Sequence, residues 1–534
     1  MSPWLCSGMA NPASRFSIAL RHPRPAGLAF LAVLVIGLWA IGAAPAGSFY
    51  DDGIYLTLGR SLARGHGFRY LNLPGTPAAT HYPPGYPALL AVCWWLGGQL
   101  PQVLLYAKIL NALLMGLASG ALAWLLAESD IPPLLAAAGV VAGAAAVPVL
   151  ALSTIPFSEP LFLVLLIGGS IMTARALRPD AGFGSYALAG LAWGAVFLVR
   201  TVGGVMIPVG ALLLMRHSGR RAAGIALAVA VGLSAPWIVW SGLHAADVPP
   251  ILSGSYGSYA GWYLQSLSIE GPRLLARIVS HNLSALLRPI GVLLTPPGPP
   301  WLGWIVIPAG LALLGFGAVA LARASVLLAG TIGLYLLVVL VWPYPPDRFV
   351  WGIWPIVTAV LASGFAQAWR SGGSSTIWRR GLAGLMMLAG AGAGGYLLRQ
   401  GDGVVHRSWE GPQLASAGSM EPTVRWVKTH AAPGVVIATV DDPMLYLYSG
   451  HPSVPVLAWS ASEHVREQSV DTAEANLERI LAQYAPEYVI LPGGGTPEAF
   501  AVERMWRERK RLELIDTLPG GGAVFRPRPP GLEH

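Results

Sequence analysis

The sequence predicts a polytopic α-helical membrane protein with about eleven transmembrane helices and a small extracytoplasmic α/β domain at its C-terminal end. Composition is the first observation: 54% of the 534 residues are hydrophobic and only 11% are charged, as is typical of a chain embedded in lipid. Charge distribution is the second, because nine of the 26 acidic residues precede residue 401 and the other 17 follow it. The chain therefore divides into an N-terminal segment (1–25), a transmembrane domain (26–400) and a water-soluble domain (401–534).

Net charge and cysteine content exclude several classes of protein. The net charge of +8 reflects arginines in loops, which suit the anionic surface of a membrane. Nucleic-acid binding is therefore not expected. The two cysteines, Cys6 and Cys93, are too few and too far apart for a disulfide scaffold or a metal site.

Basic residues predict the orientation of the chain in the membrane. Arginines that precede the first apolar stretch place the N-terminus in the cytoplasm and Asp51 on the outer side. If the apolar stretch 86–98 were a span, the basic cluster at Arg175 would lie outside, against the rule. At 13 residues the stretch is shorter than the ~20 that a span needs. We therefore predict that 86–98 lies along or just inside the outer surface.

The remaining apolar stretches alternate across the membrane. Two long outer segments are expected, 47–101 and 243–300, and the second is rich in tyrosine and tryptophan suited to the interface. The domain after residue 400 is then extracytoplasmic. The predicted spans are 26–46, 102–127, 134–152, 161–177, 182–199, 202–215, 222–242, 301–321, 325–342, 349–369 and 381–398.

The C-terminal segment has the pattern of a small α/β domain. Two short runs rich in valine and isoleucine, 435–440 and 488–491, are predicted to be buried strands. Between them, residues 472–484 carry apolar side chains at helical spacing.

The first outer loop opens with two adjacent carboxylates, Asp51 and Asp52, at the point where a membrane span meets water. Holding an acidic pair there costs desolvation free energy, so we predict that the pair is catalytic and supplies a general base. The alternative is that an aspartate caps the helix that follows. Both roles can be present, one for each residue.

A third acidic residue, Glu159, precedes the span that begins near residue 161. Alone, it could cap that helix, with Pro160 in the first turn. The predicted topology, however, returns Glu159 to the same face of the membrane as Asp51. We therefore include it among the candidate catalytic residues.

Three basic residues are candidates to bind a phosphate. Arg200 lies at the middle of a long apolar stretch, at the tip of a helical hairpin, where a guanidinium would favour a phosphodiester; the alternative is snorkelling to lipid headgroups. Arg348 lies at the entrance of a late span, and its alternative is an ion pair with Asp347, although neighbouring side chains on a helix diverge. Lys108 is the weaker candidate, about one turn inside its span.

Three side chains near the acidic pair are predicted to position a substrate. Tyr55 lies one helical turn beyond Asp51, and His81 and Tyr82 end the same loop, directly before a Pro-Pro pair. For His81 the alternative is a solvated loop side chain without a function.

The order of motifs in the first outer loop resembles a known family. A span, Asp-Asp-x-x-Tyr, a helix, Gly-x-Gly and Tyr-Pro-Pro-Gly-Tyr-Pro are similar to the first outer loop of C-type glycosyltransferases. Within that superfamily the pattern is most similar to the branch of protein O-mannosyltransferases and lipid A aminoarabinose transferases. The chain departs from this pattern in having Asp52 where the family commonly has glutamate, and in the residues that precede its Pro-Pro pair.

The resemblance implies an integral membrane enzyme that uses polyprenyl-phosphate sugars at the outer face. It implies that Asp51 is the catalytic carboxylate and that Glu159 matches the acid of the family's second outer loop. Arg348, in Asp-Arg-Phe with a downstream Trp-Pro, matches the arginine that meets the donor phosphate. No cofactor is implied, and a divalent metal is compatible with the clustered carboxylates but not required.

The resulting hypothesis is an inverting glycosyltransferase of the plasma (inner) membrane with a periplasmic C-terminal domain. Its predicted partners are membrane lipids, a polyprenyl-phosphate-linked sugar donor, and an envelope lipid, glycan or protein acceptor. Three alternatives remain: an oligosaccharyltransferase-like enzyme that uses a lipid-diphosphate glycan, a lipid or sugar transporter, and a non-catalytic scaffold. A transporter should show repeated halves with charges near the midplane, whereas the charges here collect on one face.

Overall fold

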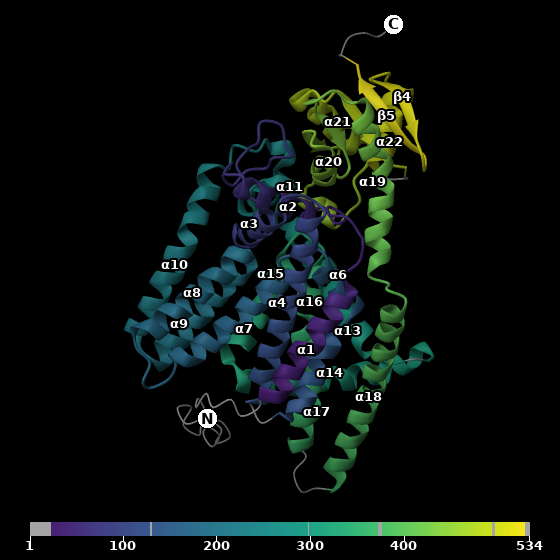
Figure 1. Cartoon of the computed structure of the whole chain (residues 1–534). Helices are drawn as coiled ribbons and strands as arrows, with labels where there is room; N and C mark the ends of the chain where they lie inside the picture. The colour runs from purple at the N-terminus through teal and green to yellow at the C-terminus, as the bar shows by residue number, and fades with distance from the viewer. Residues whose placement is uncertain (1–22, 129–130, 297, 372–375, 494–496, 529–534) are drawn as a thin grey trace.

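The computed structural model describes residues 23–128, 131–296, 298–371, 376–493 and 497–528, so most of the predicted N-terminal segment lies outside the described residues. Within these residues, six helices are long and apolar enough to cross a membrane. The number rises to eight if each of two bent helix pairs is one span. The chain thus has the predicted architecture of a polytopic helical bundle that carries a small sheet domain at one end (Figure 1).

Each predicted span contains one helix or one closely spaced helix pair. Three of them, α8, η3–α9 and α15, are apolar helices of 10–17 residues. The bundle elements are α1 (Pro23–Ala40), α4 (Gln102–Ala127), α5 (Pro133–Ala144), α6 (Val147–Thr154), α7 (Glu159–Ala176), α8 (Phe183–Val199), η3 (Thr201–Val205), α9 (Met206–His217), α10 (Arg220–Leu243), η5 (Pro300–Leu302), α14 (Gly303–Ala324), α15 (Val326–Val341), α16 (Pro346–Gly352), α17 (Trp354–Ser371) and α18 (Thr376–Val405).

Two of the predicted spans are sharply bent at a break between two helices. The axes of α5 and α6 differ by 68°, and those of α16 and α17 by 63°. Pro148 and Pro355 lie within two residues of the breaks, and proline removes an N–H and clashes with the preceding turn. Each break therefore separates a short helix, α6 or α16, from the longer helix of its pair, and the two short helices contact each other.

Small residues allow the bundle helices to approach one another closely. A Cβ atom placed on Gly120 of α4 would lie 3.0 Å from the Cβ atom of Phe30 on α1, and one on Gly37 of α1 would lie 3.0 Å from that of Ala112. Close packing of this kind replaces the hydrophobic driving force that is missing between helices in lipid.

The first outer loop folds over the end of the bundle nearest the sheet domain (Figure 1). It contains α2 (Asp51–Ala63) and α3 (Gly85–Gly97), which pack against each other where Gly59 meets Leu90. The outer segment 243–300 contains η4 (Pro250–Leu252), α11 (Ser253–Tyr256), α12 (Tyr259–Glu270) and α13 (Pro272–Leu294).

Topology can be tested with reporters that are active only outside the cytoplasm. A fusion after Gly98 should be active, and a fusion after Pro179 should be silent, because α3 has 13 residues and spans only ~20 Å of a ~30 Å hydrocarbon core. The level of each fusion protein is measured in parallel. A silent and protease-protected Gly98 fusion would mean that α3 crosses the membrane.

The C-terminal domain is a five-stranded mixed sheet in the order β2-β1-β3-β5-β4. The predicted strands and helix are present as β1, β3 and α21, whereas β2 and the β4–β5 hairpin were not predicted. Its elements are α19 (Glu410–His430), β1 (Ile437–Thr439), α20 (Asp442–Ser449), β2 (Ser453–Pro455), η6 (Ala461–His464), α21 (Val470–Tyr484), β3 (Tyr488–Leu491), α22 (Pro497–Arg507), β4 (Leu512–Leu518) and β5 (Gly522–Pro527).

The sheet places α20 next to the first outer loop. β1 pairs in parallel with both β2 and β3, and β5 is antiparallel to β3 and β4. Helix α20 is the crossover between β1 and β2, and it contacts α2 of the first outer loop. The short crossover thus joins the soluble domain to the segment that carries the acidic pair.

Candidate active site

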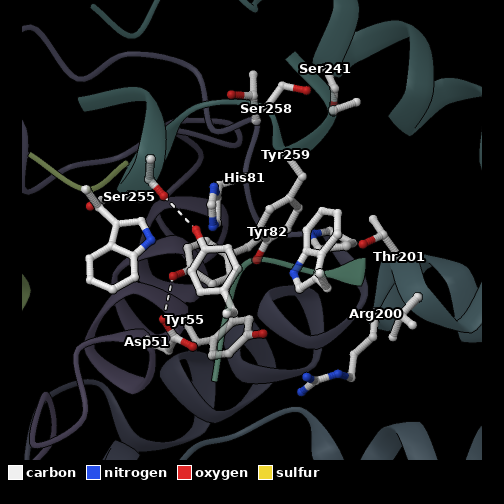
Figure 2. A pocket seen from close by; sticks show the side chains of 18 of the residues that line it. Asp51, Tyr55, His81, Tyr82, Arg200, Thr201, Ser241, Ser255, Ser258 and Tyr259 are labelled. Carbon is white, nitrogen blue, oxygen red and sulfur yellow. Dashed lines mark hydrogen bonds between the residues drawn. The ribbon is translucent and has the colours of Figure 1, made fainter. Parts of the chain in front are cut away.

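A cavity of about 890 Å³ lies between the bundle, the first outer loop and the sheet domain. Its walls come from α2, the loop that ends at Pro83, the junction of α8 and η3, the ends of α10 and α15, and the start of α12. Residues between β1 and η6 of the sheet domain, among them Leu457 and Trp459, close the side away from the bundle. In Figure 2, Asp51 and Arg200 lie at one side of this space and Ser241 and Ser258 at the other.

Four charged side chains form one cluster at the edge of the cavity. The Nε atom of Arg348 donates to Oε1 of Glu159 at 2.7 Å, and its Nη1 atom donates to Oδ2 of Asp51. Nη1 of Arg200 lies 2.6 Å from the same Oε1 atom of Glu159. Two carboxylates and two guanidiniums are therefore joined in a chain that runs from Asp51 to Arg200.

Glu159 lies behind the two arginines and not in the cavity wall. It is the first residue of α7, and 2% of its side chain is exposed. A buried carboxylate needs compensating charge, which both guanidiniums supply. In the structure Glu159 thus holds the guanidiniums of Arg200 and Arg348 in place, and its predicted catalytic role stays a prediction.

Arg200 occupies the break between two helices. Helix α8 ends at Val199, Arg200 is extended, and η3 begins at the next residue. The side chain is 12% exposed, and its guanidinium carbon lies 5.3 Å from the ring centroid of Phe349. The side chain therefore points inward to Glu159 and not outward to lipid headgroups, as the snorkelling alternative required.

Arg348 projects from the short helix α16 into the cavity. Its side chain is 27% exposed, and its guanidinium carbon lies 3.8 Å from the ring centroid of Phe157. The alternative ion pair with Asp347 does not form, because Asp347 is paired with Arg288 at 3.7 Å. As expected for neighbours on a helix, the two side chains diverge.

Asp51 is held from two sides while one face stays open. Tyr82 Oη donates to its Oδ1 atom at 2.6 Å, and Arg348 holds the other oxygen. The side chain is 27% exposed and lines the cavity. Burial and the neighbouring carboxylate of Asp51 raise the pKa of Tyr82 well above its usual value, so this phenol remains a hydrogen-bond donor.

Asp52 has a different role from its neighbour. Its carboxylate is buried and accepts the N–H groups of Gly47 at 2.6 Å and Phe49 at 3.0 Å. It therefore ties the turn before α2 and does not cap that helix, which corrects the capping interpretation. Burial raises the pKa of Asp52 to about 6, against the lowering effect of the two N–H donors. Asp52 does not line the cavity.

Lys108 is also placed away from the cavity. Its Nζ atom donates to the carbonyl oxygens of Gly42 at 2.9 Å and Ala44 at 2.8 Å. These carbonyls belong to the linker between α1 and α2, so the lysine fixes the chain that leads to Asp51. The structure does not bring Lys108 together with Arg200 and Arg348.

The predicted positioning residues all line the cavity. Tyr55 Oη lies 3.1 Å from Oγ of Ser158, the residue before Glu159. His81 is buried, with Nδ1 2.7 Å from the carbonyl oxygen of Gly257, and burial lowers the pKa of its ring to about 4. The alternative of a solvated loop histidine is therefore wrong.

Sequence reasoning missed an aromatic part of the cavity wall, formed by Tyr259, Trp342, Tyr344 and Trp459. The ring centroids of Tyr259 and Trp342 are 5.4 Å apart, and Tyr344 stacks on Trp459 of the sheet domain at 6.2 Å. The tyrosines of the outer segment had suggested a membrane interface, but Tyr259 faces the cavity (Figure 2). Apolar and aromatic walls with a few polar groups are typical of ligand sites.

The cavity wall, as far as the structure describes it, offers few side chains that could coordinate a divalent metal. Among the residues that the structure describes, no group of three His, Cys, Asp or Glu side chains could hold a metal ion. Of the described acidic residues, Asp51 alone lines the cavity, and two guanidiniums lie beside it. Divalent cations such as Mg²⁺ favour several oxygen ligands, so this edge of the cavity suits an anion.

Comparison with known proteins gives matches at the level of structure. No protein-family model matches the chain, and no curated protein matches it. ArnT from Cupriavidus metallidurans in the apo state matches with a TM-score of 0.50 and 14% identity over 93% of this chain and 96% of that chain. The Archaeoglobus fulgidus oligosaccharyltransferase complex with Zn and sulfate matches with a TM-score of 0.51 and 13% identity over 93% and 73%. These matches confirm the predicted C-type glycosyltransferase-like fold.

Proposed function

We propose that this chain is an inverting glycosyltransferase that moves a sugar from a polyprenyl-phosphate donor to an acceptor at the outer face of the plasma (inner) membrane. One observation carries the proposal: a partly exposed carboxylate, Asp51, and two guanidiniums, Arg200 and Arg348, line the same cavity at the end of an apolar bundle. The C-type glycosyltransferase-like fold supports it.

Asp51 is the general base of the proposed reaction. It takes the proton from an acceptor hydroxyl or amine while that group attacks the anomeric carbon from the face opposite the phosphate. The new bond joins the acceptor to the anomeric carbon, and the bond from that carbon to the phosphate oxygen breaks. The electron pair leaves with the phosphate, so the configuration inverts. Tyr82, which donates to Asp51, orients the carboxylate for this step.

The two arginines stabilise the departing lipid phosphate. Negative charge grows on the phosphate as the sugar leaves, and fixed donors aimed at such charge are the largest catalytic term in many enzymes. Arg348 now contacts Asp51, and a donor phosphate takes over that contact and frees the carboxylate oxygen. Glu159 keeps both guanidiniums in place through its own contacts with them.

The walls of the cavity divide between the lipid and the acceptor. Toward the bundle the lining is apolar, with Phe197, Ile238 and Val338, and we assign this side to the polyprenyl chain. Toward the sheet domain the lining carries Ser255 and the aromatic wall, and we assign this side to an envelope lipid, glycan or protein acceptor. No cofactor is assigned, because the two guanidiniums supply the positive charge that the leaving group needs.

The proposal is tested with purified protein in vesicles made with envelope lipids. Radiolabelled sugar should move to an envelope component from a polyprenyl-monophosphate donor, but not from a nucleotide sugar or a polyprenyl-diphosphate glycan, and should still move after chelation of divalent metals. Mass spectrometry of envelope lipids and glycans from cells with and without the protein identifies the acceptor. Transfer only from the diphosphate glycan would favour the oligosaccharyltransferase-like alternative. No donor consumption at all would favour a transporter.

A further inference from the structure

Helix α20 of the sheet domain packs against the turn that directly precedes Asp51. The N–H group of Ala46 donates to Tyr448 Oη at 2.8 Å. A Cβ atom on Gly47 would lie 2.6 Å from that of Met444. Segment 46–53 is therefore shaped by contact with the soluble domain.

Asp442, the first residue of α20, is the polar centre of this contact. Its buried carboxylate accepts hydrogen bonds from Tyr50 Oη at 2.9 Å, from Asn72 Nδ2 at 2.8 Å and from Tyr256 Oη. All three donors belong to the first outer loop or the outer segment. One carboxylate of the sheet domain thus joins both segments that cover the cavity.

Tyr50 is the donor that bears on the reaction. Its backbone has φ 62° and ψ −65°, a conformation that costs free energy for a bulky residue and persists only where the surroundings impose it. Because Tyr50 directly precedes Asp51, these angles set the direction in which the Asp51 side chain leaves the backbone. The N–H group of Asp51 donates to the carbonyl oxygen of Phe49 at 2.6 Å and closes a tight turn over Tyr50, and the bond from Tyr50 Oη to Asp442 is the side-chain contact that anchors this turn.

We propose that Asp442 is a positioning residue for Asp51 and that it acts through Tyr50. The inference rests on the proposed function, in which Asp51 is the general base. A contact that only stabilised the interface between the two domains would not affect the rate of transfer, whereas this proposal requires that the hydrogen bond of Tyr50 does. Catalytic groups need geometry held to fractions of an ångström, so a displaced Asp51 should lower kcat more than it changes KM.

Three variants test the proposal in the full-length protein: Tyr50→Phe, Asp442→Ala and the double variant. Tyr50→Phe and Asp442→Ala should each lower kcat by about tenfold or more, which is the equivalent of one hydrogen bond to a charged group. The donor KM should stay within about twofold of wild type, because KM rises when an interaction that binds substrate and transition state equally is lost, and neither variant removes such an interaction. The double variant should be no slower than Asp442→Ala, because both changes remove the same bond. Multiplicative losses, or wild-type kcat in Tyr50→Phe, would overturn the proposal.

A matched control and a second readout separate positioning from general damage. Asp516→Ala removes another carboxylate of the same domain, which accepts from Trp426 Nε1 at 2.8 Å within that domain, and kcat should stay at the wild-type value. Hydrogen exchange of peptide 46–53 should be faster in Tyr50→Phe and Asp442→Ala but not in Asp516→Ala. This readout needs no activity, so it holds even if Asp51 is not the base. Unchanged exchange in Tyr50→Phe contradicts the proposal; if Asp442→Ala does not fold, Tyr50→Phe decides alone.

Discussion

Replacing Asp51 by asparagine is expected to abolish sugar transfer while leaving the amount of folded protein close to that of wild type. The amide keeps the size of the carboxylate and accepts the hydrogen bond from Tyr82, but it cannot take a proton from the acceptor. A general base typically contributes ~10²–10⁴-fold to the rate, so the turnover number should fall by that factor. Donor binding should persist, because Arg200 and Arg348 remain.

The neighbouring acid is the matched comparison for this experiment. Asp52→Asn should lower stability more than turnover, because an amide accepts only one of the two N–H groups that the carboxylate now accepts, at a cost of about 1–3 kcal/mol. Transfer is measured from radiolabelled lipid-phosphate sugar and divided by the amount of folded protein. If Asp51→Asn retains a tenth of the wild-type rate, about 1.4 kcal/mol of barrier, Asp51 is not the base. If Asp52→Asn is inactive and Asp51→Asn is active, Asp52 is the base and Asp51 is not.

Arg348→Lys is expected to lower kcat/KM by about 10²-fold or more, although the charge is kept. The guanidinium uses Nε for Glu159 and Nη1 for Asp51 at the same time. A single ammonium group lacks the planar fork that makes both contacts, and it also binds a phosphate less well than a bidentate guanidinium. The loss should therefore appear in both donor KM and kcat.

The control for this change is Arg323→Lys, at an exposed arginine that donates to Gln367 Oε1 at 3.0 Å away from the cavity. Its kinetic constants should match those of wild type. Steady-state transfer is measured over a range of donor concentrations for both variants. Wild-type kcat/KM in Arg348→Lys would show that only the charge at this position matters and that the two-pronged contact does not.

The arrangement of charged residues was predictable where each one lies at a helix end. Asp51 begins α2, Glu159 begins α7, Arg200 follows α8 and Arg348 lies on α16. Alternation of spans placed all of these ends on one side of the bundle, and a few acids and arginines in lipid-facing sequence stand out because their burial is costly.

Residues that bind backbone groups or distant side chains could not be predicted in the same way. Lys108 binds carbonyl groups, and Asp52 binds N–H groups, of a linker whose path depends on the whole fold. Asp442 and Tyr50 are 392 positions apart in the sequence. Asp442 lies in the C-terminal domain, for which the sequence pattern predicted only strands and a helix. Composition and periodicity report local structure, and they contain no signal for such pairings.

The shared contact of Arg348 has a consequence for turnover that follows from conservation of charge. Within the proposed reaction, the negative charge that leaves Asp51 on protonation reappears on the lipid phosphate as the sugar departs. The same guanidinium serves both anions, so it binds the product most strongly while Asp51 is protonated. Loss of that proton to solvent restores a rival carboxylate next to Arg348 and weakens its hold on the phosphate. Transfer of the proton away from Asp51 therefore resets the base and, in the same step, weakens the contact that holds the spent lipid phosphate.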